Sequence, residues 1–502
     1  MALNTLLFSW FPFLLFIPLL YLFIRRKPDG RNRPPSPPKL PIIGNLHQLS
    51  TKLHRSFSRL SLKYGPIMLM DICSVPLLVI SSSEMAREIL KTHDHVFCSR
   101  PKLDGVRRHS YNHKDIAFSP YGNYWREMRK LCVLEVLSPK RVQLFGYVRV
   151  EEVAYMIDSI SASCSSVIRL DKKLMFLTDH IIQRVALGTS YRGKNDDSRE
   201  FSKLVHGALY TIGLSSAADM VPFLGRVIKF VTTLSYWHEK NFRALDSFLD
   251  QVVKEHTDPN RQKSESEDIV DVLLRLQSGD QFGEVSLTKT HIKAAVMDMF
   301  IAGIDTTAVS IGWTMAELVR NPRVMKKVQT EVRSCIGKKG KVEESDLDRL
   351  HYLKMVIKES LRLNPPSSIL LPRESMSHCN INGYDIDPKT MVLVNVWGIG
   401  RDPGLWKNPN EFFPERFIDC SIDPKGQYFE FLPFGSGRRG CPGMQLATAV
   451  SELALANLLY CFNWELPAGM KAVDMDMDEG GIFVIHKKSG LQLVPIKYNW
   501  ES

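Results

Sequence analysis

Residues 434–443 read FGSGRRGCPG and form the most informative stretch of this 502-residue chain. Gly435, Gly437 and Gly440 fit the pattern G-x-G-x-x-G. That pattern binds dinucleotides when a strand precedes it and an acid follows about 20 residues later, at the end of a second strand. Here a proline precedes the loop, and Glu452 falls inside a predicted helix. Only about 60 residues remain, too few for a doubly wound nucleotide domain. The glycines therefore do not indicate a nucleotide site.

Cys441 is the residue that gives this loop its chemistry. Pro442 suits the first position of a helix, where its missing N–H costs nothing. Free N–H groups and the positive helix end then lie near the sulfur, which lowers the pKa of a thiol and favours thiolate. One thiolate with no companion Cys or His makes a poor zinc site. It suits iron held by a macrocycle, which needs one axial ligand from the protein. For this loop alone, a glycine-rich turn with an incidental cysteine is the simpler alternative.

A second informative stretch lies inside a long apolar helix predicted over residues 288–321. Residues 302–307 read AGIDTT. Gly303 and the two threonines are poor helix formers, and threonine hydroxyls compete for backbone carbonyls. They predict a local distortion with room for water or a small ligand. Asp305 beside Thr306 could relay protons there. The alternative is a threonine bonded to its own helix.

Three further groups of residues carry charge in recognisable patterns. Glu359 and Arg362 lie three residues apart on a helix that a Pro-Pro pair ends, and Arg416 belongs to the sequence PERF. The first two form a routine helical ion pair when taken alone. Trp125 and Arg129 lie one helical turn apart, which suits stacking on and pairing with an anionic group. Arg373, after the double proline, supplies a further cation.

The N-terminus predicts a membrane anchor over residues 1–24. Residues 5–24 are uncharged and apolar, and a stretch of about 20 such residues crosses a bilayer core. Basic residues follow at once: Arg25, Arg26, Lys27, Arg31 and Arg33. Positive flanks stay in the cytosol, so the N-terminus should face the lumen. A cleaved signal peptide is disfavoured, because its charge would precede the apolar core. Residues 25–45 are basic and then proline-rich, which predicts a stiff extended hinge.

The composition is that of a globular protein with a basic excess. The chain is 44% hydrophobic and 24% charged, with a net charge of +11. No dense Lys/Arg block or zinc-finger spacing occurs, so nucleic acid is not expected as a partner. The nine cysteines are odd in number and scattered, which does not indicate a disulfide framework. No Asn-x-Ser/Thr sequon occurs, in agreement with a cytosolic body.

The chain after the hinge is expected to form one mainly helical unit over residues 46–502. Strands are predicted within residues 66–82, 381–396 and 482–497, so a modest sheet would combine distant parts of the chain. A helix is predicted over residues 444–461, and residues 255–267 should form a polar loop. So large a unit would be explained by a buried cofactor that organises its core.

Taken together, these motifs resemble the cytochrome P450 haem-thiolate monooxygenases. The pattern F-x-x-G-x-R-x-C-x-G over residues 434–443 matches completely. The threonine-bearing helix, the E-x-x-R pair and the PERF element precede it in the family's order. The resemblance covers essentially the whole chain and is greatest to the plant A-type microsomal members. It implies a mainly α fold with a small β subdomain, preceded by a single N-terminal transmembrane helix.

The resemblance also implies roles for individual residues around haem b. Cys441 would be the proximal ligand of the iron, and Phe434 would pack beside its thiolate. Thr306 and Asp305 would deliver protons on the distal side, while Glu359, Arg362 and Arg416 would form a structural triad. The implied contacts of the haem propionates are Trp125, Arg129, Arg373 and Arg439. The implied substrate contacts are Met297, Ile301, Ala302, Ile369, Leu370 and Ile482.

The implied function is oxidation of a small hydrophobic plant specialised metabolite, such as a terpenoid, an alkaloid or a phenylpropanoid. One oxygen atom of O₂ would enter the substrate, with electrons from NADPH through a separate reductase. The protein would be a single-pass protein of the endoplasmic reticulum membrane, in contact with lipid, and its catalytic domain would face the cytosol. Two alternatives stay open. One is a redox-neutral dehydratase or isomerase, acting for example on an oxime, and the other is a non-enzymatic haem-binding protein.

Overall fold

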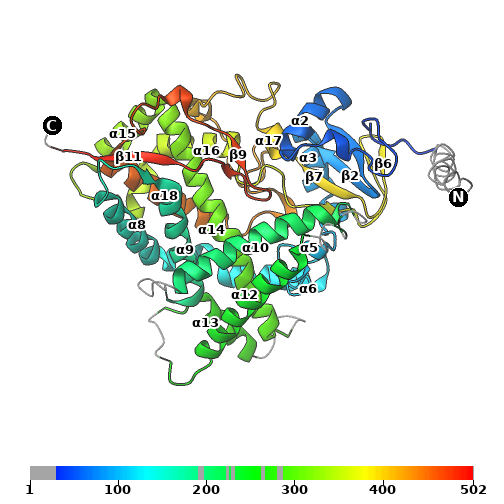
Figure 1. Ribbon diagram of the computed structural model, residues 1–502, viewed down its shortest axis with the longest axis horizontal. Coiled ribbons are helices and arrows are strands. Elements are labelled where there is room, and N and C mark those ends of the chain that lie inside the picture. Colours follow the sequence, from blue (N-terminus) through cyan, green and yellow to red (C-terminus); the bar gives the residue numbers. More distant parts are fainter. Residues whose placement is uncertain are drawn as a thin grey trace, which may run out of the picture.

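The computed structural model describes residues 30–189, 197–221, 225, 227, 232–261, 266–279 and 286–500. The expected membrane anchor, residues 1–24, lies outside the described residues. A large helical part and a smaller β-rich part lie side by side (Figure 1). The prediction of a mainly α fold with a small β part is confirmed.

The helices are α2 (Leu53–Tyr64), α3 (Ser83–Arg87), α4 (Asp94–Phe97), α5 (Asp104–Arg107), α6 (Asn123–Leu131), α7 (Pro139–Leu144), α8 (Gly146–Ser161), α9 (Leu170–Leu187), α10 (Asp197–Asp219), α12 (Leu234–His256), α13 (Ile269–Ser278), α14 (Lys289–Arg320), α15 (Pro322–Ile336), α16 (His351–Leu363), α17 (Val396–Ile399) and α18 (Met444–Cys461). The strands are β1 (Ile67–Ile72), β2 (Val75–Ile80), β3 (Ile168–Arg169), β4 (Arg373–Glu374), β5 (Cys379–Ile381), β6 (Tyr384–Ile386), β7 (Met391–Val394), β8 (Phe462–Glu465), β9 (Glu479–Gly480), β10 (His486–Lys487) and β11 (Gln492–Lys497).

Helix α14 runs through the centre of the helical part (Figure 1). Thr288 caps its N-terminus, where the side chain accepts a hydrogen bond from the backbone of His291. The predicted helix over residues 288–321 is therefore confirmed. Among the described residues α14 alone is long and apolar enough to cross a membrane. More than half of its most apolar window is buried inside the molecule, as expected for a core helix.

The predicted distortion of α14 is wrong, because the helix is continuous through residues 302–307. The Thr306 hydroxyl donates to the Ala302 carbonyl at 2.6 Å, so the threonine is bonded to its own helix. Gly303 has a packing reason instead. A Cβ atom at this position would stand 2.8 Å from Cδ1 of Ile182 on α9. The glycine lets the two helices approach closely.

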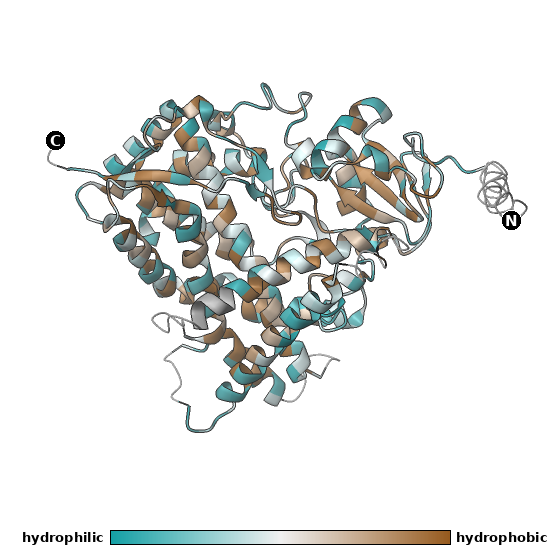
Figure 2. Ribbon diagram, in the orientation of Figure 1, coloured by the Kyte–Doolittle hydropathy of each residue, from teal (hydrophilic) through white to brown (hydrophobic). Residues whose placement is uncertain are grey.

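The strand predictions are confirmed in outline, and the strands form several small sheets. Strands β1 and β2 make the antiparallel hairpin expected within residues 66–82, and β2 pairs in parallel with β7. The resulting order is β1-β2-β7-β4, and a second sheet has the order β3-β11-β8. Strands β6 and β7 fall within residues 381–396, and β10 and β11 fall within 482–497. Apolar residues concentrate on β1, β2 and β7 (Figure 2).

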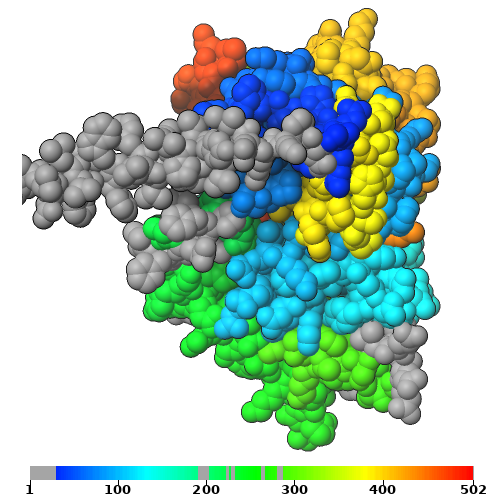
Figure 3. Space-filling view, turned by 90° about the vertical axis from the view of Figure 1, so that its right-hand side faces the viewer, coloured from blue at the N-terminus to red at the C-terminus, as the bar shows by residue number. Residues whose placement is uncertain are grey.

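The proline-rich segment is bonded to the β-rich part from residue 31 onward. The Asn32 side chain donates to the carbonyl of Gly383 at 2.8 Å, and Arg33 pairs with Asp387 at 3.1 Å. In the face shown in Figure 3, the blue residues of this segment lie beside the yellow β5–β6 hairpin. The described part of the expected hinge is therefore anchored to the body rather than separate from it.

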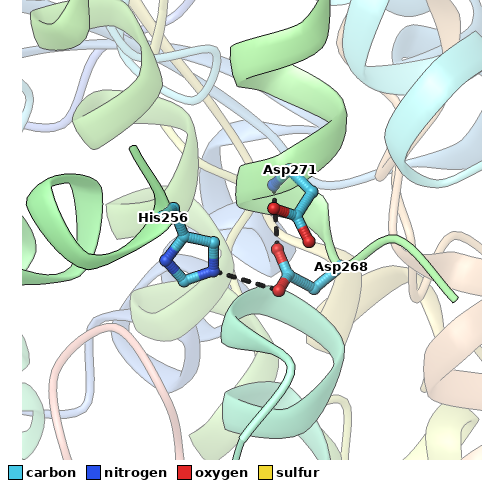
Figure 4. A group of neighbouring side chains, drawn as sticks. All are labelled: His256, Asp268 and Asp271. Carbon is cyan, nitrogen blue, oxygen red and sulfur yellow. Dashed lines mark hydrogen bonds and ion pairs between the residues drawn. The ribbon is translucent and has the colours of Figure 1, made fainter. Parts of the chain in front are cut away.

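The predicted polar loop at residues 255–267 begins where α12 ends, at His256, and residues 262–265 lie outside the described residues. His256 Nε2 lies 3.0 Å from Oδ2 of Asp268, which caps α13 by accepting from the backbone of Asp271 (Figure 4). Arg261 donates to both carboxylates, at 2.8 and 2.5 Å. Because a guanidinium already neutralises these acids, the cluster is a salt-bridge network that joins α12 to α13.

Candidate active site

The cysteine loop is held by its own backbone. Gly435 and Gly437 have φ angles of +68° and +69°, which disfavour any residue with a side chain. A Cβ atom on Gly437 would also stand 2.3 Å from the carbonyl oxygen of Leu90. The Cys441 N–H donates to the carbonyl of Phe434 at 2.9 Å and closes the loop. The position of the sulfur is thus fixed by the local sequence.

The helix after the cysteine has the predicted bounds but does not include Pro442. Helix α18 starts at Met444, so Pro442 lies in the preceding turn and not at the first helical position. The backbone N–H groups of Gly443 and Met444 still point to the Cys441 sulfur. Burial nevertheless raises the pKa of this thiol, and the two N–H groups and Arg129 only partly oppose it. The N–H groups lower the thiol pKa as predicted, but burial outweighs them. The donors that stabilise a thiolate are present, as metal binding requires.

A cavity of about 350 Å³ lies between the cysteine loop and α14. Cys441 and Phe434 line one side, and Thr306 lines the other, together with Ile301 and Ala302. Leu370 also lines it. The candidates Met297, Ile369 and Ile482 do not line this cavity, and Ile482 lines a second cavity instead. Most of the wall is apolar, and its segments include parts of α9, α10, α14 and α18 and the loops after α5 and α16.

Four arginines gather at one end of the cavity: Arg100, Arg129, Arg373 and Arg439. Arg439 stacks on Trp125, with 3.9 Å between its Cζ atom and the ring centroid, and donates to backbone carbonyls of three residues. Burial, with the charges of Arg373 and Arg129, lowers the pKa of Arg439 to about 9. Trp125 is buried behind Arg439 and does not itself line the cavity.

The other arginines of this cluster are likewise bonded mainly to backbone carbonyls. Arg373 donates to Asp94 at 2.6 Å and to the carbonyl of Ser436 at 2.8 Å. Arg129 donates to the carbonyl of Gly440. Arg100 donates to the carbonyls of Leu371 and Pro372, and burial with the charges of Arg439 and Arg373 lowers its pKa well below the ordinary value. The sequence alone did not identify Arg100, because no motif marks it. Asp94 pairs with Arg373, but the carbonyls around the other three arginines carry no full charge, so this end of the cavity favours an anionic ligand.

Glu359, Arg362 and Arg416 come together in the core on the cysteine-loop side. Arg362 makes two hydrogen bonds to the Glu359 carboxylate, at 2.7 and 2.9 Å, and Arg416 adds a third at 2.9 Å. The side chains of Glu359 and Arg362 are 0% exposed. The aromatic residues Trp406, Phe417 and Phe431 pack together next to these groups and lead to the residues just before the cysteine loop.

Asp305 and Thr306 face different cavities. Consecutive helical residues project about 100° apart. Thr306 lines the main cavity, whereas Asp305 lines the second cavity and pairs with His206 of α10 at 3.0 Å. Burial lowers the pKa of His206, but the contact with Asp305, its charge and that of Asp179 outweigh burial and raise it. The sequence alone did not identify His206, which lies 99 positions from its partner and outside every motif.

Comparison with known proteins decides the family. A family model described as cytochrome P450 matches residues 34–493. The chain belongs to the cytochrome P450 family. It is 48% identical to cytochrome P450 71B37 of Arabidopsis thaliana over 495 residues, which cover 97% of this chain and 99% of that protein. It is 49% identical to cytochrome P450 71A9 of Glycine max over 474 residues, covering 93% and 94%. These relatives identify it as a plant A-type cytochrome P450.

Solved cytochrome P450 structures have the same fold. A zebra fish cytochrome P450 with abiraterone aligns with a TM-score of 0.76 at 26% identity, covering 90% of this chain and 100% of that chain. A zebra fish cytochrome P450 structure with progesterone aligns with a TM-score of 0.77 at 26% identity, covering 88% of this chain and 99% of that chain. Cytochromes P450 are haem-thiolate monooxygenases that use haem b and electrons from NADPH delivered by a reductase. A cysteine and a cluster of incompletely neutralised arginines in the wall of one cavity fit this cofactor, whose iron accepts a thiolate and whose propionates are anionic.

Proposed function

We propose that this cytochrome P450 oxidises a small hydrophobic plant specialised metabolite, such as a terpenoid, an alkaloid or a phenylpropanoid. The observation that carries the proposal is the mostly apolar cavity, with the Cys441 thiol on one side and the Thr306 hydroxyl on the other. An apolar wall gives affinity through burial of apolar substrate surface and sets few polar requirements. The zebra fish structures with abiraterone and progesterone support a cavity for apolar ring systems in this fold.

Cys441 would hold the haem iron, with Phe434 beside the sulfur, and Arg129, Arg373 and Arg439 would bind the propionates. Trp125 would keep Arg439 in place by stacking, and Arg100 extends the same cationic group. When bound, the haem supplies the activation of dioxygen and the transfer of one oxygen atom to the substrate. The Glu359 triad would hold the chain behind the cysteine loop.

Thr306 would hold a proton donor in place on the distal side of the cavity. Its hydroxyl hydrogen points to the Ala302 carbonyl, so its oxygen is free to accept a hydrogen bond from a water in the cavity. Asp305 would supply protons from the second cavity, where His206 keeps its carboxylate in place. An acid next to a hydroxyl on two sides of one helix suits transfer between the two cavities.

Residues 1–24 would anchor the protein in the endoplasmic reticulum membrane, with the hinge at 25–45 and the catalytic domain at 46–502 on the cytosolic side. The partner would be an NADPH-dependent reductase. The net charge of +11 favours docking to an acidic surface of that reductase. Loss of membrane association after deletion of residues 1–24 would support the anchor, and unchanged association would contradict it.

The function is tested in microsomes that contain the full chain and a plant reductase. A panel of plant metabolites is first screened for binding by shifts of the haem absorbance, and binders are then assayed for NADPH use, O₂ use and product. NADPH-dependent product with one added oxygen supports the proposal. Conversion of an oxime without NADPH would establish the redox-neutral alternative. An intact thiolate-type CO spectrum with no turnover across the panel would contradict the proposal.

A further inference from the structure

Two carboxylic acids in the cavity wall belong to none of the motifs used so far. Asp115 lies in the loop between α5 and α6, and Asp298 lies on α14, one turn before Ala302; both line the cavity. Asp298 Oδ2 accepts from the backbone N–H of Ile116 at 2.7 Å, and the N–H of Ala117 also donates to this carboxylate. The side chains of the two acids lie within hydrogen-bonding reach of each other.

Two carboxyl groups can be hydrogen-bonded to each other only when a proton lies between them. The contacts of each group indicate which acid carries this proton. Asp298 accepts two backbone N–H groups, which favours its ionised form. Asp115 accepts the N–H of Phe118 at 3.1 Å, and its own backbone N–H also favours its ionised form. Its Oδ1 atom is buried and accepts from no donor among the described residues. A hydroxyl at this atom that donates to Asp298 satisfies both groups.

The electrostatic surroundings agree with this assignment. Burial raises the pKa of Asp298 to about 7, while its backbone donors oppose the increase. Burial and the neighbouring Asp298 raise the pKa of Asp115 well above the ordinary value. Both shifts favour retention of a proton by the pair, more strongly on Asp115 than on Asp298.

The backbone that Asp298 holds also orients the arginine cluster. The carbonyl of Ile116 accepts from Trp125 Nε1 at 3.0 Å and from Arg439 at 3.3 Å. The carbonyl of Ala117 accepts from Arg100 Nε at 2.9 Å. The same two peptide segments thus bond on their N–H side to α14 and on their carbonyl side to the cluster.

We propose that Asp115 and Asp298 share one proton, carried by Asp115, and act as a positioning pair that fixes the loop at Ile116 and Ala117 against α14 and thereby aims Arg439 and Arg100. Neither acid needs to touch the substrate for this role. The consequence for haem rests on the proposed propionate contacts of the cluster, whereas the shared proton does not. The two parts can therefore be tested separately.

The shared proton is tested by infrared spectroscopy on the full-length holoenzyme. A protonated carboxyl group absorbs apart from ionised carboxylates and shifts when its proton is exchanged for deuterium. Wild-type protein should show one such acid band that is absent from the Asp115→Asn variant. The matched control is Asp104→Asn in α5, an acid whose side chain is 73% exposed, which should leave all acid bands unchanged. If Asp115→Asn removes no acid band, the shared proton is excluded.

The position of the proton predicts an asymmetry between two conservative variants. In Asp115→Asn the amide still donates to Asp298 and its oxygen still accepts from Phe118, so haem loss should stay within about threefold of wild type. In Asp298→Asn the amide offers one acceptor where the loop needs an anion, so haem loss to an apo-haem scavenger should be at least about tenfold faster. Greater damage from Asp115→Asn would place the proton on Asp298 and overturn the assignment.

Further results separate the two parts of the proposal. If either variant stabilises the holoenzyme against heat, the acids were both ionised and repelling each other, and the proposal fails. If the acid band is present but Asp298→Asn loses haem no faster than wild type, the positioning role is overturned while the shared proton stands. Arg439→Gln serves as the control for the haem contact itself. Unchanged haem loss in Arg439→Gln would contradict the proposed propionate contacts instead.

Discussion

The two sides of the cavity are built in different ways. On the cysteine side, backbone bonds and positive φ angles within residues 434–443 fix the sulfur, and a buried ion-pair triad lies behind it. On the α14 side, polar side chains pair with partners from distant elements, such as Asp305 with His206. Local backbone geometry tolerates little change. On the α14 side one residue of a side-chain pair can be replaced while the backbone stays in place, so substitutions there should have graded effects on activity.

The largest effect is expected at the cysteine itself. Cys441→Ser keeps the loop glycines and nearly the same volume but replaces the thiolate, which is a far better ligand for iron than a neutral hydroxyl. Monooxygenase activity and the thiolate-type CO spectrum should both be lost. Survival of that spectrum in the variant would show that another residue ligates the iron. Cys98→Ser is a suitable control, because Cys98 is buried but outside the wall of the cavity.

The next largest effect is expected in the triad behind the loop. Glu359→Gln removes the charge that neutralises Arg362, whose side chain is fully buried. Removing one partner of a buried ion pair destabilises a protein by about 3–5 kcal/mol, because the other charge stays buried without compensation. Chemical unfolding of the holoenzyme measures this loss. Arg243→Gln, which breaks a surface pair on α12, should change the free energy of unfolding by less than about 0.5 kcal/mol. Equal effects of the two substitutions would contradict the structural role.

On the α14 side the hydroxyl of Thr306 should matter more for coupling than for stability. Thr306→Val keeps the shape of the side chain and removes its hydrogen-bonding oxygen. The fraction of consumed NADPH that appears as oxidised product should fall by about a hundredfold, the lower end of what positioned proton transfer contributes. The CO spectrum should stay intact, because the cysteine side is unchanged. Undiminished coupling in the variant would exclude Thr306 from proton delivery.

The same difference explains how much could be predicted from the sequence. Helices α14 and α18 were predicted almost to the residue, because long apolar runs determine them locally. The cysteine loop could also be predicted, since its glycines and its cysteine lie within one stretch of ten residues. The residues that pair with side chains of α14 could not be predicted from the sequence. His206, Arg100 and the acid pair are joined only by the fold, and no spacing along the chain marks them. The contact of Gly303 with Ile182 was missed for the same reason, because Ile182 lies on another helix.

The smallest effect is expected at His206, and it depends on pH. Because the pKa of His206 is raised in the folded protein, its ion pair with Asp305 is complete below the unfolded value of about 6.5 and is lost as pH rises through the folded pKa. His206→Gln removes this titration while keeping a donor toward Asp305. Coupling of NADPH to product should fall by about threefold at pH 6.5 and should then change less with increasing pH than in wild type.

A matched control separates this effect from surface titration. His378 is half exposed and lies 3.3 Å from Asp385, far from α14 in the β-rich part, so His378→Gln should leave the pH profile of coupling unchanged. Superimposable profiles for His206→Gln and wild type would show that Asp305 acts without its histidine. The α14 side would then resemble the cysteine side, because its chemistry would depend on one helix and not on an ion pair between α10 and α14. A flattened profile would instead establish that proton supply on this side depends on how α10 lies against α14.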